Sequence, residues 1–281
     1  MMVTISDLNF TYSRRKRLFD KLSLNLSHGH IYGLLGKNGT GKSTLLHLLS
    51  GVLFPLKGTI EVFGSVPEKR EVPFLQDLFL IPEEFSVPDV TPTKYADLYA
   101  QFYPRFDENQ YDLYLREFEI VSGDSMSKMS MGQRKKAFIA FALACNTRVL
   151  LMDEPTNGLD IPSKTQFRKI IASVPTDERC IVISTHQVRD LENLIDTVVI
   201  LEDHRIVFNE SIDEIAAKVR FISYNDSDKP GDILYDEPGV VGGKAIVPNE
   251  NEPPSKVDME ILFNAVTSTN KDVNPVFTIK N

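Results

Sequence analysis

The chain has 281 residues, of which 42% are hydrophobic and 25% are charged, and its formal net charge is −8. A chain of this length buries a substantial core and has room for one large domain or two smaller ones. The acidic balance argues against a nucleic-acid-binding surface, so no nucleic-acid partner is expected. Two cysteines outside any C-x-x-C motif argue against a disulfide framework and indicate a reducing compartment.

We expect neither a targeting segment nor a membrane segment. No basic-then-apolar signal segment opens the sequence. The longest uninterrupted apolar run, Ala137 to Cys145, is far shorter than the ~20 residues that a membrane helix needs. The chain itself is therefore not expected to span a bilayer.

The first elements along the chain are predicted to be strands. Val3 to Tyr12 and Leu22 to Leu26 have the period-two alternation of half-buried strands. The basic run Arg14-Arg15-Lys16-Arg17 between them is interpreted as a solvated hairpin turn, with a local basic patch as the alternative. A third, apolar strand, Ile31 to Leu35, leads into a glycine-rich stretch.

That stretch has the G-x-x-x-x-G-K-[ST] spacing of a phosphate-binding P-loop, between an apolar strand and the apolar helix Leu45 to Leu49. Its glycines are expected to take φ > 0, so that backbone N–H groups and the helix N-terminus face a polyphosphate. Lys42 can reach the β- and γ-phosphates, and the Ser43 hydroxyl is placed to ligate Mg²⁺. The alternative is a turn that merely joins strand to helix. The expected nucleotide contacts are Gly36, Asn38, Gly39, Thr40, Gly41, Lys42, Ser43 and Thr44.

After the P-loop helix, which Gly51 is expected to cap, the pattern alternates between strands and helices. Strands are predicted within Lys57 to Gly64 and over Leu78 to Ile81. Helices are predicted over Thr91 to Tyr103, Glu108 to Val121 and Lys136 to Cys145. The region from about residue 84 to 140 is therefore interpreted as a helical insertion within a parallel-sheet domain.

A second fully apolar strand, Val149 to Met152, ends in Asp153-Glu154. The carboxylate of Asp153 would emerge at the end of the strand beside the P-loop, where it can bind Mg²⁺ through water. Glu154 would be placed to orient and polarise a water for in-line attack on the γ-phosphorus. The alternative is a pair of acidic residues that caps the following helix.

From about residue 2 to 215 the chain resembles the ATP-binding cassette (ABC) ATPases, on several motifs in the expected order. Ser130-Met131-Gly132-Gln133 resembles the signature motif of that family, and Asn157-Gly158-Leu159-Asp160 resembles its D-loop. His186, directly after the apolar strand Cys180 to Ser184, resembles its switch histidine. Tyr12 stands where the family places an aromatic ring on adenine. Taken singly, Tyr12 could be strand packing and His186 a surface turn residue.

The resemblance implies an α/β fold: a P-loop NTPase parallel sheet with an N-terminal antiparallel β subdomain and a helical insertion. It implies an ATPase that uses ATP and Mg²⁺, with Lys42, Glu154 and His186 as catalytic residues. It also implies a head-to-tail dimer, expected to be a homodimer, in which the signature motif of one subunit covers ATP on the P-loop of the other. The further nucleotide contacts implied are Ser130, Gly132, Gln133 and Asp160.

Two positions depart from the family pattern. Met131 replaces the usual first glycine of the signature. Glu83 follows the strand where the family has its Q-loop glutamine, and an acid can bind metal or water but cannot donate an amide hydrogen bond. Gln76 is the alternative, although it precedes the strand. The expected metal ligands are Ser43, Asp153 and Glu83.

Beyond residue 209 the chain leaves the shared core. Ser211 to Glu214 has capping-box spacing for a helix through about Val219. Short strands are predicted at Ile233 to Tyr235 and Ala245 to Val247, and a helix from Lys256 to Val266. We therefore expect an ATPase domain over residues 1–220 and a small α+β extension over residues 221–281.

Three functions remain open at this level. The leading one is a cytoplasmic ATPase subunit, bound to the membrane through a separately encoded integral permease, that powers transport, with export as the expected direction. The second is a soluble ABC ATPase that acts on ribosomes or another cytosolic machine. The third is a non-hydrolysing regulatory homologue, against which the presence of Lys42, Asp153, Glu154 and His186 argues.

Overall fold

The computed structural model describes residues 1–13, 16–250, 252–268 and 276–277. A six-stranded sheet in the order β5-β6-β7-β3-β8-β9 forms its centre, and all neighbouring strands are parallel except β8 and β9. The strands are β3 (His30–Leu35), β5 (Leu78–Ile81), β6 (Val149–Asp153), β7 (Cys180–Thr185), β8 (Thr197–Glu202) and β9 (Arg205–Ser211). The parallel core predicted from the sequence is confirmed.

A smaller antiparallel sheet in the order β2-β1-β4 comes from the N-terminal part of the chain. Its strands are β1 (Val3–Ser13), β2 (Lys16–Leu26) and β4 (Lys57–Val62). β2 begins six residues before the predicted Leu22, because irregularities in its pairing with β1 interrupt the alternation there. Lys16 and Arg17 of the basic run therefore belong to β2, whereas Arg14 and Arg15 lie outside the described residues.

Eight α-helices are present among the described residues: α1 (Lys42–Leu49), α2 (Val72–Gln76), α3 (Pro92–Tyr99), α4 (Glu108–Glu117), α5 (Met131–Ala144), α6 (Ile161–Ser173), α7 (Ile212–Lys218) and α8 (Met259–Thr267). Short 3₁₀ turns are η1 (Pro67–Lys69), η2 (Ala100–Phe102), η3 (Met126–Lys128), η4 (Val188–Leu191) and η5 (Asp226–Asp228). Three of the helices, α3 to α5, lie between β5 and β6 in the chain, as the helical insertion requires.

Helix ends differ from the sequence prediction where local capping decides them. α5 begins at Met131 rather than Lys136, because Ser130 and Gln133 form a reciprocal capping box. α4 ends at Glu117 rather than Val121, since Glu119 takes φ 56° and cannot continue the helix.

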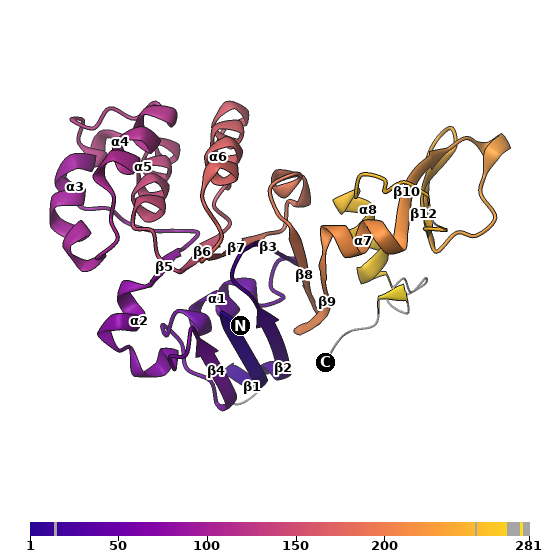
Figure 1. The fold of residues 1–281 in the computed structure, drawn as a ribbon, viewed down its shortest axis with the longest axis horizontal. Helices are drawn as coiled ribbons and strands as arrows, with labels where there is room; N and C mark the ends of the chain where they lie inside the picture. Colours follow the sequence, from indigo (N-terminus) through magenta and orange to yellow (C-terminus); the bar gives the residue numbers. More distant parts are fainter. Residues whose placement is uncertain (14–15, 251, 269–275, 278–281) are drawn as a thin grey trace.

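Two hydrophobic clusters cover the two faces of the central sheet, and alternate residues of each parallel strand enter alternate clusters. Leu151 and Val182 pack with α1 and the three-stranded sheet. Met152 and Ile183 pack with α5 and α6. Figure 1 shows this layering, with α1, β1, β2 and β4 on one side of the central sheet and α3 to α6 on the other. The carboxyl ends of β3, β6 and β7 are thereby presented at one edge.

The C-terminal region forms a third sheet in the order β10-β12-β11, with β10 (Val219–Tyr224), β11 (Tyr235–Pro238) and β12 (Gly243–Pro248). α8 begins at Met259 rather than Lys256, because the Asp258 carboxylate accepts hydrogen bonds from the first N–H groups of the helix. Phe277 is 2% exposed and packs edge-to-face on Phe208 of β9 at 5.1 Å. The division into residues 1–220 and 221–281 stays a prediction.

Candidate active site

The P-loop joins the end of β3 to the start of α1. Gly39 and Gly41 take φ values of 83° and 114°, as predicted. The prediction of φ > 0 is wrong for Gly36. Glycine is required at this position because there is no space for a side chain. A Cβ atom there would lie 2.5 Å from the carbonyl oxygen of Leu201 and 2.8 Å from Oγ1 of Thr40.

A cavity of about 470 Å³ opens between the P-loop and the ends of β6 and β7. It brings together ten of the predicted site residues: Tyr12, Asn38, Gly39, Gly41, Lys42, Ser43, Thr44, Glu83, Glu154 and His186. Leu18 and Asn157 complete its lining. Residues far apart in the sequence thus form one hollow with basic, acidic and hydroxyl groups.

Lys42 is buried in this cavity at the first turn of α1. Its Nζ donates to the carbonyl oxygens of Gly36 at 2.8 Å and Lys37 at 3.2 Å, and lies 3.8 Å from Oε1 of Glu154. Burial lowers the pKa of Lys42, and the carboxylates of Glu154, Asp153 and Glu83 oppose that shift. The ammonium is therefore held at the P-loop side of the cavity by main-chain oxygens and one carboxylate.

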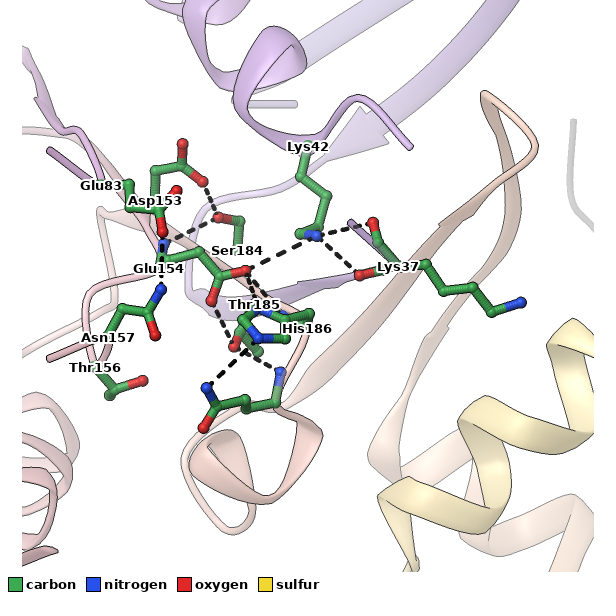
Figure 2. A network of polar contacts seen from close by, with 12 residues as sticks. Lys37, Lys42, Glu83, Asp153, Glu154, Thr156, Asn157, Ser184, Thr185 and His186 are labelled. Carbon is green, nitrogen blue, oxygen red and sulfur yellow. Dashed lines mark hydrogen bonds and ion pairs between the residues drawn. The ribbon is translucent and has the colours of Figure 1, made fainter. Parts of the chain in front are cut away.

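Glu154 is held at its main chain and at both carboxylate oxygens. Its N–H donates to the carbonyl oxygen of Ser184 at 3.1 Å and to its Oγ at 3.2 Å. Oε2 accepts from the Thr185 hydroxyl at 3.0 Å. Oε1 accepts from the His186 N–H at 3.0 Å and lies 2.8 Å from Nδ1 of the ring. Figure 2 shows the carboxylate between Lys42 and His186.

The backbone of Glu154 is in the left-handed region, with φ 45°. A non-glycine residue there is held by its surroundings at a cost of about 1–3 kcal/mol. Each hydrogen bond named above compensates part of this cost, and together they fix the direction of the carboxylate. With Nδ1 of His186 donating to that carboxylate, Nε2 is the unprotonated nitrogen of the neutral imidazole, and it lies 3.5 Å from Nε2 of Gln187.

Asp153 faces Ser184 across the β6–β7 pairing, is 3% exposed, and accepts a hydrogen bond from the Ser184 hydroxyl. Oε1 of Glu83 accepts from Nδ2 of Asn157 at 2.8 Å. The donor set of Ser43, Asp153 and Glu83 consists of hydroxyl and carboxylate oxygens, which are the ligands that Mg²⁺ prefers. Among the described residues no cluster of three His, Cys, Asp or Glu ligands occurs, and Mg²⁺ commonly takes one or two carboxylates and completes its shell with phosphates and water. Gln76, the alternative to Glu83, lies in α2.

Other predicted residues lie outside the cavity lining. Ser130, Gly132 and Gln133 form the N-terminus of α5, where a Cβ on Gly132 would meet the carbonyl oxygen of Gly158 at 3.4 Å. Asp160 is the N-cap of α6, and hydrogen bonds from Ser163 lower its pKa. The hydroxyl of Thr40 donates to the carbonyl oxygen of Lys37 at 3.0 Å.

Tyr12 stands at the cavity with 67% of its surface exposed. Its hydroxyl shares a 2.9 Å hydrogen bond with the hydroxyl of Thr44, and its ring packs edge-to-face on Phe10 at 4.9 Å. Stacking of this ring on adenine stays a prediction.

The sequence reasoning missed three buried residues of the site: Lys135, Ser184 and Thr185. Ser184 and Thr185 end an apolar strand, and the rule that ligands bind at the carboxyl ends of parallel strands is the signal that could have found them. Lys135 carries no such signal, because its partners lie 19 and 22 residues away.

The comparisons with known proteins agree with this geometry. The ABC transporter family model matches residues 19–157. The chain is 30% identical over 216 residues to the molybdate import ATP-binding protein MolC of Haemophilus influenzae, covering 74% of this chain and 82% of that protein. It is 29% identical over 240 residues to the bacitracin transport ATP-binding protein BcrA of Bacillus licheniformis, covering 81% and 76%.

The fold is shared with solved ATP-binding cassettes. A dimeric post-hydrolysis structure of a cassette bound to ADP and Pi superposes with a TM-score of 0.66 at 20% identity, covering 75% of this chain and 98% of that chain. The likeness of fold, the family match and the P-loop cavity lead to one conclusion: the chain belongs to the ATP-binding proteins of ABC transporters, which bind and hydrolyse ATP to power transport.

Proposed function

We propose that this chain hydrolyses ATP as a homodimer and powers export through a separately encoded membrane permease. The observation that carries the catalytic part is the Glu154 carboxylate, buried and oriented by Thr185 and His186, 3.8 Å from the P-loop lysine Lys42. A carboxylate held in this way is placed to orient a water for in-line attack on a phosphate bound at the P-loop.

Phosphate binding follows from the same residues. The N–H groups around Gly39 and Gly41 and the N-terminus of α1 favour negative charge. Lys42 would exchange its main-chain carbonyl partners for phosphate oxygens. Ser43, Asp153 and Glu83 would hold Mg²⁺, which neutralises phosphate charge when bound. His186, tied to Glu154 through Nδ1, would present Nε2 toward the terminal phosphate, to which it donates when both ring nitrogens carry protons.

Dimerisation is supported by the exposure of the signature segment. Ser130 is exposed, and Met131 is 56% exposed at the N-terminus of α5. A second copy in head-to-tail orientation would bring its nucleotide to this helix N-terminus, with Ser130 and the Gly132 N–H as donors. Asp160 and Gln133 would lie beside the same nucleotide.

Association with a permease is supported by the surface of the helical insertion. Leu98, Tyr99 and Phe102 expose between 37% and 57% of their surfaces on α3 and η2. Among the described residues no helix combines the length and apolarity needed to cross a membrane, so the proposed location at the cytoplasmic face depends on this partner. BcrA, a bacitracin transport protein, supports a role in transport, and export is the direction that we propose. Import is the competing direction, since MolC is a molybdate import protein.

The decisive catalytic experiment is Glu154→Gln. We expect this variant to bind ATP with wild-type affinity while kcat falls about 10²–10⁴-fold, because the amide cannot accept a proton from water. Glu178→Gln, in the exposed turn that precedes β7 and outside the cavity lining, is the matched control and should keep the wild-type rate. Wild-type turnover by Glu154→Gln would contradict the assignment of the base.

The partner is tested by purifying the tagged protein from its native membranes in mild detergent and identifying what co-purifies by mass spectrometry. A polytopic membrane protein in stoichiometric amount supports the transport complex. Recovery with ribosomes alone would favour the soluble ABC ATPase instead.

A further inference from the structure

Lys135 is a buried lysine that the catalytic roles above do not use. It lies in α5, five residues after Ser130, and is 1% exposed. Its Nζ donates to the carbonyl oxygens of Glu154 and Asn157, each at 3.0 Å. Burial lowers the pKa of Lys135, and the carboxylates of Glu83, Glu154 and Asp153 oppose the shift. Keeping a cation in such a place is costly unless it is partnered, so its position requires an explanation.

The two carbonyls belong to one tight turn. The N–H of Asn157 donates to the carbonyl oxygen of Glu154 at 3.1 Å, which closes the turn from residue 154 to 157. The first residue of this turn has φ 45°. Lys135 therefore binds both ends of the turn whose first residue carries the carboxylate of the site.

The turn is connected to the cavity at both ends. From its first residue, the Glu154 carboxylate reaches His186 and Thr185. From its last residue, the Asn157 amide donates to Glu83 at 2.8 Å. If the turn shifts, the Glu154 carboxylate moves with it and the hydrogen bond from Asn157 to Glu83 is altered.

We propose that Lys135 is a positioning residue for ATP hydrolysis: its ammonium clamps the turn from Glu154 to Asn157 to α5 and so fixes the Glu154 carboxylate in the cavity. The inference rests on the proposed role of Glu154 as the group that orients water. It also gives α5, whose N-terminus is the signature segment, a direct polar connection to the site of its own subunit.

The main test replaces the ammonium by a methyl thioether of similar length, Lys135→Met. We expect kcat to fall about 10–100-fold, since a misplacement of about 1 Å has effects of this size. ATP affinity should stay within about twofold of wild type, because Lys135 does not line the cavity. Lys136→Met is the matched control: it removes the next lysine of the same helix, which is 8% exposed and whose Nζ lies 3.4 Å from Oε1 of Gln166. Its kcat should stay close to wild type.

A purely structural role is separated by combining Lys135→Met with Glu154→Gln. If Lys135 acts through Glu154, the double variant turns over no more slowly than Glu154→Gln alone. Multiplication of the two losses, or wild-type kcat in Lys135→Met, would overturn the proposal. If Lys135→Met does not fold, Lys135→Gln, which keeps a buried polar donor, is judged by the same criteria. Wild-type turnover by Glu154→Gln would instead refute the proposed function itself, so the two failures are distinguishable.

Discussion

Ser184→Ala tests whether the end of β7 organises the carboxylates of the site. The Ser184 side chain is fully buried, its hydroxyl donates to the Asp153 carboxylate, and it accepts from the N–H of Glu154 at 3.2 Å. The substitution removes one oxygen atom and leaves the backbone unchanged. Its effect is therefore the loss of these two hydrogen bonds.

The magnitude follows from what each partner retains. The N–H of Glu154 keeps the Ser184 carbonyl oxygen at 3.1 Å, so its loss is small. The Asp153 carboxylate, 3% exposed, loses a charge-assisted hydrogen bond of about 1.5–3 kcal/mol. We expect the free energy of unfolding to fall by about 2 kcal/mol, which lowers the urea midpoint by roughly 0.8 M for an m-value of about 2.5 kcal/mol/M.

The assay is urea unfolding monitored by circular dichroism, with ATP turnover measured on the same samples. Ser173→Ala is the control, because that hydroxyl is at the surface end of α6 and donates only to the Ile170 carbonyl oxygen at 2.7 Å. Its free energy of unfolding should change by less than about 0.5 kcal/mol. An unchanged urea midpoint for Ser184→Ala would refute the claim that this buried bond stabilises the site.

Three other expectations concern binding, chemistry and pH. Lys42→Ala should weaken ATP binding itself, measured by titration with a fluorescent nucleotide, because it removes the ammonium that we propose binds the phosphates; unchanged affinity would contradict that role. Glu83→Gln should reduce turnover less than Glu83→Ala, since an amide oxygen can still accept from Asn157; equal losses in a steady-state ATPase assay would show that the charge is what matters. Burial raises the pKa of Tyr32 from 10.0 to about 12, so the folded state retains its proton longer and stability falls as pH rises through this window, by about 2–3 kcal/mol in all. Burial also raises the pKa of Tyr95, Tyr103 and Tyr111, so Tyr32→Phe should reduce the alkaline slope of the urea midpoint without abolishing it, and an unchanged slope would exclude Tyr32 as a contributor.

Local patterns in the sequence were sufficient to predict several strands, one helix cap and the P-loop. The strand predicted over Leu78 to Ile81 has the same bounds as β5 in the structure. The Ser211 hydroxyl accepts a hydrogen bond from the N–H of Glu214 at 3.1 Å and caps α7, as its spacing predicts. The P-loop and the acidic end of β6 were likewise recognisable, because their function depends on short-range spacing. The cavity then collects residues from these segments.

What the sequence did not predict depends on contacts between distant segments. The requirement for glycine at Gly36 comes from the approach of Leu201, which lies far along the chain. The role of Lys135 depends on carbonyls of another loop, and main-chain carbonyls have no sequence signature. The predicted start of α5 was wrong because Ser130 and Gln133, which form its capping box, were interpreted only as part of the signature motif.

The burial of Phe277 against Phe208 has a consequence for folding cooperativity. α8 and Phe277 enter the same hydrophobic cluster as β6, β7 and α5, so the extension shares its core with the sheet that carries the site. Separate opening of the extension would expose that common core to water. We therefore expect amide protons of α8 to exchange with solvent on the timescale of global unfolding, together with those of β7.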